Sequence, residues 1–254
     1  MMNLPWILHG IVINIMQIKE TSLVFTFVIK DIHGKKISCT CFNESIQLKY
    51  KNIIKVGQIL KLSKLEIINS SFKFDLNNRF QLIIKNESLI EVITDEDFIA
   101  KFEVNINNYL NQIEIANFKK YKDESIDQCK HSFYCFCIAE SELLELTNVK
   151  GEKFSKKVCK LVDLNNEYIN LDISNTNMLN ISYTNKILLV EDSFIYTFNK
   201  IKNLKTTYSS TEITILQYNH NQQTKNLIEW FELNQQLINK LNNEMLNVYV
   251  IVFV

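Results

Sequence analysis

Cysteine and histidine are the residue types in this 254-residue chain that could bind a metal or act as a nucleophile. No Cys-x-x-Cys pair and no cysteine and histidine set at zinc spacing occurs, so the sequence predicts no metal site and no cofactor. Cys39 and Cys41 lie two residues apart in a β-rich run, which places both on one face of a strand as small buried hydrophobes. The six cysteines are Cys39, Cys41, Cys129, Cys135, Cys137 and Cys159.

Catalytic motifs are also missing from the sequence. It contains no Ser/His/Asp order, phosphate-binding P-loop, His-Glu-x-x-His pair or glycine-rich fingerprint. The four histidines lie in unrelated segments, where a lone histidine is more often structural than catalytic. We therefore predict that the chain is not an enzyme.

The formal net charge of the chain is zero, with 28 basic and 28 acidic residues. A neutral balance does not by itself demand a nucleic acid or an anionic membrane as partner, so any such binding must come from a local patch. The apolar segments 4–16 and 248–254 are shorter than the roughly 20 residues that a membrane-spanning helix needs. We expect no membrane partner.

Apolar, β-rich runs separated by turn signals predict two successive sets of strands. The first set is expected at 6–16, 23–30, 37–42, 57–68 and 80–84, with a helix starting at Asn43 and Glu44. The second set is expected at 132–139, 156–163, 168–173, 186–194 and 211–218. Both sets place a helix or loop after the third strand, which is the order of the oligonucleotide/oligosaccharide-binding (OB) barrel.

The predicted fold is therefore mainly β, with two tandem OB-fold (five-stranded Greek-key) barrels followed by a C-terminal helix. The helix is predicted because Leu227, Trp230 and Phe231 lie three and four residues apart and give an apolar stripe. The expected boundaries are 1–94 for the first barrel, 95–130 for an interdomain linker, 131–220 for the second barrel, 221–245 for the helix and 246–254 for an apolar tail.

The order of motifs resembles the tandem single-stranded-DNA-binding domains of the replication protein A large subunit. The run Phe42-Asn43-Glu44 is similar to part of that family's "AFNE" segment, and 65–72 is similar to its "I-x-N-x-x-F" hairpin. Glu229-Trp-Phe-Glu232 resembles the "G-W-F-D" helix that closes the family's next domain. The resemblance implies a nuclear protein that binds single-stranded DNA in replication, repair and recombination.

Base stacking in that family is carried by aromatic side chains. The resemblance places this role on Phe25 and Phe72 in the first barrel and on Phe198 in the second. Strand alternation supports a different interpretation of the first barrel, because Phe25 shares its parity with Phe27 and Ile29, which is typical of core residues.

The family's second-barrel tryptophan falls on Ser174 or its neighbour Ile173, and neither side chain can stack on a base. The first barrel is thus the expected main seat of DNA binding. The resemblance implies phosphate contacts for Lys19, Lys156 and Lys157. For each lysine the ordinary alternative stays open, which is a solvated surface side chain.

Two other functions stay open from the sequence. One keeps the fold and the DNA class and makes the chain a telomere-end or telomerase-associated paralogue. The other is a protein-interaction scaffold, suggested by the neutral charge and by Glu66, which stands where the family often has a lysine. The family's smaller subunits are implied partners, although the zinc-bearing domain that assembles the trimer is expected to be absent.

Overall fold

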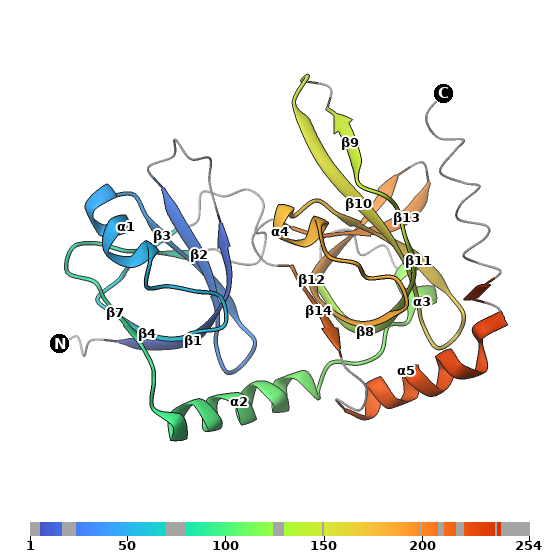
Figure 1. The fold of residues 1–254 in the computed structure, drawn as a ribbon, viewed down its shortest axis with the longest axis horizontal. Helices are drawn as coiled ribbons and strands as arrows, with labels where there is room; N and C mark the ends of the chain where they lie inside the picture. Colours follow the sequence, from blue (N-terminus) through green and yellow to red (C-terminus); the bar gives the residue numbers. More distant parts are fainter. Residues whose placement is uncertain are drawn as a thin grey trace. The chain divides into compact units, whose positions relative to one another are not determined.

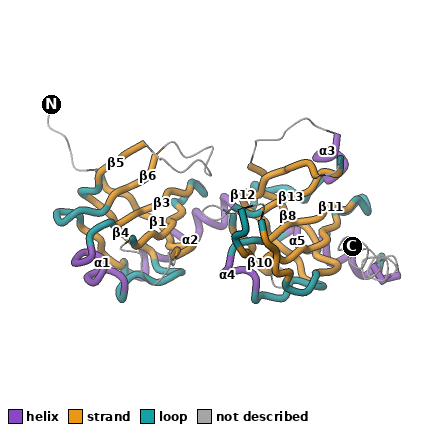
Figure 2. Tube along the Cα trace, turned by 90° about the horizontal axis from the view of Figure 1, so that it is seen from above, coloured by secondary structure: helices purple, strands orange, loops and turns teal. Residues whose placement is uncertain are grey.

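The structure is a computed structural model that describes residues 6–16, 24–69, 80–123, 130–148, 150–198, 200–207, 211–216, 221–236 and 238–239. The chain divides into two compact units, Met1–Gln112 and Ile113–Val254. Each unit is built around a seven-stranded sheet, and Figure 2 shows that strands form most of both units. Among the described residues, no helix is long and apolar enough to cross a membrane.

The first unit begins with strands β1 (Ile7–Met16), β2 (Phe25–Lys30) and β3 (Lys36–Cys41) and helix α1 (Glu44–Lys51). It continues with β4 (Ile59–Ser63), β5 (Glu66–Asn69), β6 (Phe80–Ile83), β7 (Leu89–Val92) and helix α2 (Glu96–Leu110) (Figure 1). The sheet order is β5-β6-β3-β2-β1-β4-β7, with β3 and β6 parallel. Because β4 leads directly into β5, these pairings close the sheet into an OB barrel.

Helix α1 begins where the sequence predicts it. Asn43 is the N-cap, and its side-chain oxygen accepts a hydrogen bond from the backbone N–H of Ser45 at 2.9 Å. This bond satisfies one of the N–H groups that a helix N-terminus leaves without an intrahelical partner. The predicted helix start is confirmed.

Helix α2 packs on the outside of the first barrel. Its Phe98 ring lies 4.9 Å from the ring of His9 on β1. Near the end of the helix, the Tyr109 ring covers Gly34 so closely that a Cβ at that position would overlap the ring. Gly34 also has a φ of +74°, so both its backbone conformation and its cover favour glycine. The segment predicted as a linker, 95–130, therefore contains a helix that belongs to the first unit.

The second unit begins with helix α3 (Phe118–Asp123) and strands β8 (Lys130–Glu140), β9 (Leu144–Thr147), β10 (Lys153–Val162) and β11 (Tyr168–Ile173). It continues with helix α4 (Thr176–Leu179), strands β12 (Lys186–Phe198), β13 (Ile201–Lys205) and β14 (Glu212–Leu216), and helix α5 (Gln222–Leu233). The order β11-β13-β12-β8-β10 closes into a second OB barrel because β10 also pairs with β11. Both predicted barrels are thus confirmed.

The fifth strand of this second barrel is not the one that the sequence predicts. The segment 211–218 was expected to fill that place, but its strand β14 pairs with the first half of β12. The fifth barrel strand is β13, which forms a hairpin with β12 and runs parallel to β11. Its sequence, Ile-Lys-Asn-Leu-Lys, is too short and polar to signal a strand without its neighbours.

The two barrels repeat the same turn and cap at a constant spacing. Asp31 accepts hydrogen bonds from the backbone N–H groups two and four residues further on, at 2.9 and 2.8 Å. Asp163, 132 residues later, makes the same two bonds at 2.8 and 3.0 Å. The helix caps Asn43 and Asn175 are also 132 residues apart. The barrels can therefore be aligned residue by residue through this region.

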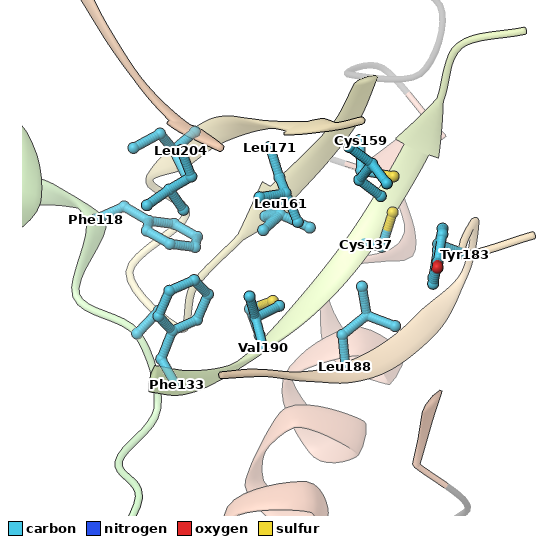
Figure 3. Packing of buried hydrophobic residues seen from close by; sticks show 14 of the residues in the cluster. Phe118, Phe133, Cys137, Cys159, Leu161, Leu171, Tyr183, Leu188, Val190 and Leu204 are labelled. Atoms are coloured by element: carbon cyan, nitrogen blue, oxygen red, sulfur yellow. The ribbon is translucent and has the colours of Figure 1, made fainter. Parts of the chain in front are cut away.

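The core of the second barrel is formed by aromatic, aliphatic and cysteine side chains (Figure 3). Phe118 and Phe133 meet edge to face with ring centroids 5.7 Å apart. Cys137 and Cys159 lie nearby, and all the described cysteines of the chain are free and buried. Burial raises the pKa of Cys137, so this thiol stays protonated and unreactive in the fold. The prediction that Cys39 and Cys41 are core residues is confirmed.

Helix α5 covers the second barrel next to β8. The Phe231 ring stacks on Phe136 with centroids 4.3 Å apart, and Leu227 and Trp230 are buried beside it. The predicted C-terminal helix is present, and the last residues of its predicted range, 240–245, lie outside the described part of the chain, as does the tail 246–254.

Candidate nucleic-acid interface

Phe25 lies inside the first barrel. Its side chain is 6% exposed, and its ring is 5.8 Å from that of Phe27, which shares its face of β2. Both rings belong to the core of this barrel. This position agrees with the core position that strand alternation predicts for Phe25. It does not support the stacking role that the resemblance implies, because stacking needs a ring that a base can reach. Phe72 and Lys19, the other predicted contacts of the first unit, lie outside the described residues.

Lys157 occupies the equivalent place in the second barrel, 132 residues after Phe25, and it too points inward. Its Nζ donates a hydrogen bond to the carbonyl oxygen of Ile181 at 2.8 Å and lies 3.9 Å from a carboxylate oxygen of Glu140. The same carboxylate accepts a hydrogen bond from the backbone N–H of Tyr183 at 2.6 Å. Lys157 therefore holds the segment after α4 in place, and these contacts occupy its ammonium group so that it is not available to a phosphate.

Lys156, by contrast, points outward from the barrel. Its Nζ lies 2.6 Å from Oδ2 of Asp172 on the neighbouring strand β11. The lysine side chain is 25% exposed, so it takes part in the surface of the sheet rather than in the core.

Phe198 is the predicted stacking residue that the structure leaves open. It ends β12 with 61% of its surface exposed. Across the hairpin it pairs with Ile201, which is 63% exposed. The hairpin thus carries an apolar pair in solvent, a position from which an aromatic ring can meet a base.

These side chains belong to a larger outward surface, which we call the second-barrel face. The core residues of β10, β11, β13 and the second half of β12 alternate with residues that point away from the core. The outward set that defines this face is Lys156, Lys160, Asn170, Asp172, Tyr196, Phe198, Asn203 and Lys205. Three lysines, two amides and two aromatic rings therefore share this face with one carboxylate, and of these Lys160 and Asn203 are each only 7% exposed.

Asp172 and Tyr196 are joined near the centre of the second-barrel face. The Tyr196 hydroxyl donates a hydrogen bond to Oδ2 of Asp172. Burial and then this carboxylate raise the pKa of Tyr196 well above its ordinary value, so the phenol keeps its proton. The ammonium group of Lys205 lies 5.5 Å from the centre of the Tyr196 ring. The ring is held in place from two sides.

A second aromatic site lies where β11 begins. The ammonium groups of Lys160 and Lys122 lie 4.3 and 4.9 Å from the centre of the Tyr168 ring, which is 46% exposed. Lys122 also forms an ion pair with Glu167 at 2.7 Å. Two cations beside one exposed ring are suited to a nucleotide, whose base can stack while its phosphate meets a lysine.

The β9–β10 hairpin extends the second-barrel face beyond the barrel (Figure 1). Phe154 pairs with Leu146 across the hairpin, on the same side of β10 as Lys156. Phe154 is 42% exposed. Sequence reasoning missed this ring and also Tyr168 and Tyr196, because only their positions in the sheet show which side chains face outward.

The described part of the corresponding face of the first barrel carries less charge. The 132-residue alignment places Thr40 where the second barrel has Asp172, and Val28 where it has Lys160. Strand pairing places Ile83 where the second barrel has Lys205. Lys30 and Lys36 stand opposite each other at the turn end of this face, but only 5% and 6% of their surfaces are exposed.

Phe42 is an exposed ring of the first barrel that sequence reasoning did not select, and Phe80 at the start of β6, 51% exposed, is another. Phe42 follows β3 directly, precedes the helix cap Asn43, and is 55% exposed. Its signal is present in the sequence as an aromatic residue just before a helix start. In the second barrel the same place is held by Ser174, where the family's tryptophan was expected.

The fold and this face define the chain as a tandem OB-fold protein. No family model matches the sequence, and a search of curated proteins finds no match either. Among solved structures, a chain of a replication protein A heterotrimer bound to single-stranded DNA matches with a TM-score of 0.64 and 16% identity. The match covers 91% of this chain and 52% of that one, so this chain spans about half of its length.

Other solved structures match more distantly. Fission yeast Pot1 with single-stranded DNA gives a TM-score of 0.35 at 10% identity, covering 91% of this chain and 88% of that one. The p202 HIN1 domain with a double-stranded DNA 12-mer gives 0.40 at 16% identity, covering 83% and 92%. Of these three structures only the first exceeds a TM-score of 0.5, and at 16% identity it shows the fold alone.

Proposed function

We propose that this chain is a single-stranded DNA-binding protein of the replication protein A type. The observation that carries the proposal is the second-barrel face, where exposed or half-exposed rings alternate with lysines on the outer surface of an OB barrel. Similarity of fold to a replication protein A chain supports the assignment.

Binding would combine two physical effects. A base stacked on an aromatic side chain contributes about 1–3 kcal/mol by alanine substitution, with little dependence on sequence. Phe198 on β12 and Tyr168 on β11 supply such rings at the same end of their strands, because Phe198 pairs with Ile201 at the start of β13 and β13 runs parallel to β11. Lys205, which is exposed at the other end of β13, supplies a phosphate contact that weakens as salt is added.

The setting that we propose is nuclear DNA replication, repair or recombination, in which the chain protects single strands without chemistry on them. This setting follows from the resemblance to the replication protein A large subunit. Smaller subunits of that type are not needed for the contacts described on the second-barrel face.

The test is fluorescence anisotropy with a labelled single strand of about 30 nucleotides, since OB folds cover roughly 4–16 nucleotides each. The same sequence as a duplex is the comparison. We expect tight, salt-dependent binding to the single strand and weak binding to the duplex. Equal affinity for both forms would overturn the proposal, and binding of neither form would favour the protein-scaffold interpretation.

Variants locate the site in the same assay. Phe198→Ala and Lys205→Gln should each weaken binding to the single strand. Leu233→Ala and Lys225→Gln are the matched controls, because both residues are exposed on α5 and neither belongs to the outward set that defines the second-barrel face. If the controls weaken binding as much as the face variants do, the second-barrel face is not the site.

A further inference from the structure

Asp172 is the carboxylate at the centre of an otherwise basic and aromatic surface. Its side chain is 16% exposed, and it lies on β11 between two flanking strands. If the second-barrel face only bound phosphates, a carboxylate at this place would oppose binding, because it repels anions and competes for the lysines. Its position therefore needs another explanation.

The contacts of Asp172 leave one of its oxygens available. Lys156 and the Tyr196 hydroxyl both donate to Oδ2. Among the described residues, no side chain donates to Oδ1. Because a carboxylate oxygen accepts at most about two hydrogen bonds, Oδ2 is filled and Oδ1 is the acceptor that remains. The two donors also fix the plane of the carboxylate.

The neighbouring amides point to the same chemistry. Asn170 lies two residues before Asp172 on the same side of β11, and its Nδ2 donates to Oδ1 of Asn203 at 3.3 Å. The second amide, Asn203, donates its own Nδ2 to the carbonyl oxygen of Ile201 at 3.0 Å. This leaves Oδ1 of Asn170 as another acceptor near Oδ1 of Asp172. The centre of the face thus presents acceptors, while its lysines lie around them.

The edges of the four bases differ in how they meet such acceptors. Cytosine, adenine and guanine each carry an exocyclic amino group, which donates hydrogen bonds. At the position of the cytosine amino group, thymine and uracil carry a carbonyl oxygen instead, so a carboxylate oxygen placed there meets another acceptor and only the adjacent N3–H of these bases could donate to it. The difference in binding free energy between the bases is largest where the site is preorganised and its buried acceptor would otherwise be left unpaired.

We propose that Asp172 reads the exocyclic amino group of one base, so that the second barrel prefers single strands containing cytosine, adenine or guanine over strands of thymine or uracil. Phe198 lies four residues along β12 from Phe194, the residue on the level of Asp172, and supplies the surface on which that strand stacks. This inference rests on the proposed single-stranded DNA binding and adds base selectivity to it.

Oligo(dC) and oligo(dU) are the matched probes for this selectivity. Both are pyrimidine strands that differ at the base edge, where cytosine has an N4 amino group beside an acceptor N3 and uracil has a carbonyl oxygen beside an N3–H. A hydrogen bond to a charged acceptor predicts that the full chain binds oligo(dC) about tenfold more tightly than oligo(dU). Equal affinities within about twofold would overturn the inference while leaving single-stranded DNA binding intact; binding of neither strand would instead overturn the proposed function.

Asp172→Asn separates base reading from simple charge repulsion. The amide can turn its NH2 group toward a carbonyl, so we expect the preference for oligo(dC) to disappear or reverse. If Asp172 only competes for lysines, this variant binds both strands more tightly and keeps the wild-type ratio, which would contradict the inference. Lys205→Gln is the control, because this exposed lysine does not donate to Asp172 and its loss should weaken both strands alike while keeping the preference for oligo(dC).

A modified strand tests the same contact without changing the protein fold. Replacing both hydrogens of the cytosine N4 amino group with methyl groups removes the donor. Wild-type protein should therefore bind an oligo(dC) strand modified in this way no better than oligo(dU). In Asp172→Asn the same modification should have little effect, because the contact is already lost. An equal loss in both proteins would show that the methyl groups act by bulk and would overturn the assignment to Asp172.

Discussion

Phe42 and Ser174 hold the same place in the two barrels, each directly before the asparagine that caps the helix after the third strand. One barrel presents a ring at this place, 55% exposed, and the other a hydroxyl. Among the described residues, the charged positions show the opposite distribution, since the lysines and the carboxylate of the second-barrel face have no charged counterpart at Val28, Thr40 and Ile83. The two barrels therefore present different side chains at equivalent places.

Phe42→Ala should weaken binding to single-stranded DNA by about 1–3 kcal/mol, because it removes a stacking surface from the first barrel. The expected change in stability is small, since the side chain is mostly in solvent. Anisotropy titrations measure the binding, and thermal unfolding checks the fold. Leu48→Ala on α1, where the residue is 69% exposed, is the control and should bind as wild type does.

Ser174→Phe should have the reverse effect. Ser174 is exposed, and its described contact is made by its backbone N–H, which donates to the hydroxyl of Thr206 at 3.1 Å. A ring can therefore be added without removing a side-chain bond. We expect tighter binding to the single strand in the same titration, and unchanged or weaker binding would show that strands do not pass this place in the second barrel.

Lys156 and Lys157 are adjacent in sequence and should give opposite results. Lys156→Gln should reduce the slope of log affinity against log salt by about 0.7, the value for one phosphate contact on a single strand. Lys157→Gln should leave that slope unchanged and lower the free energy of unfolding by about 1–3 kcal/mol, because the carbonyl of Ile181 loses its charged donor. Urea unfolding followed by circular dichroism measures the second effect.

The sequence was sufficient for most of the barrel strands, and the reason is physical. The apolar runs of the first four strands are long, and the Asp31 turn and the Asn43 cap are local devices that a sequence shows directly. Strand β13 escaped prediction because its five residues become a strand only through pairing with β11 and β12. Long-range pairing is the information that local patterns lack.

The site was harder to predict for a related reason. Phe25 and Phe198 are both phenylalanines in strands, yet one is 6% and the other 61% exposed. Alternation divides the residues of a strand between two faces, but it shows which residues are buried only when the inward face is known. At Phe25 the resemblance led to a stacking prediction although alternation favoured the core. Tyr196 and Asp172 meet across an intervening strand, so no spacing in the sequence brings them together.

Trp230 ties helix α5 to the turn between β10 and β11. Its indole N–H donates to Oδ1 of Asn166 at 3.1 Å, and Asn166 has a φ of +63°. Trp230→Phe keeps most of the buried ring but removes the donor, which should cost about 1 kcal/mol of unfolding free energy. Urea unfolding followed by circular dichroism gives the value, and Leu233→Ala, at an 85% exposed position on the same helix, should cost almost nothing.

His9 should make the first barrel less stable in mild acid. Burial against α2, and then the charge of Lys61 opposite it on β4, lower the pKa of His9 below its ordinary value of 6.5. The folded state therefore takes up the proton less readily than the unfolded state, so the stabilisation is complete above pH 6.5 and declines as the pH falls toward the lowered pKa. Lys61 is itself paired with Glu91 at 3.1 Å, which keeps its charge in place near the imidazole.

An NMR titration of the His9 ring should give a midpoint below 6.5, and His9→Gln should lose less stability than wild type between about pH 8 and pH 5 in urea unfolding. A midpoint at or above 6.5 would show that the Phe98 contact does not exclude water from the ring.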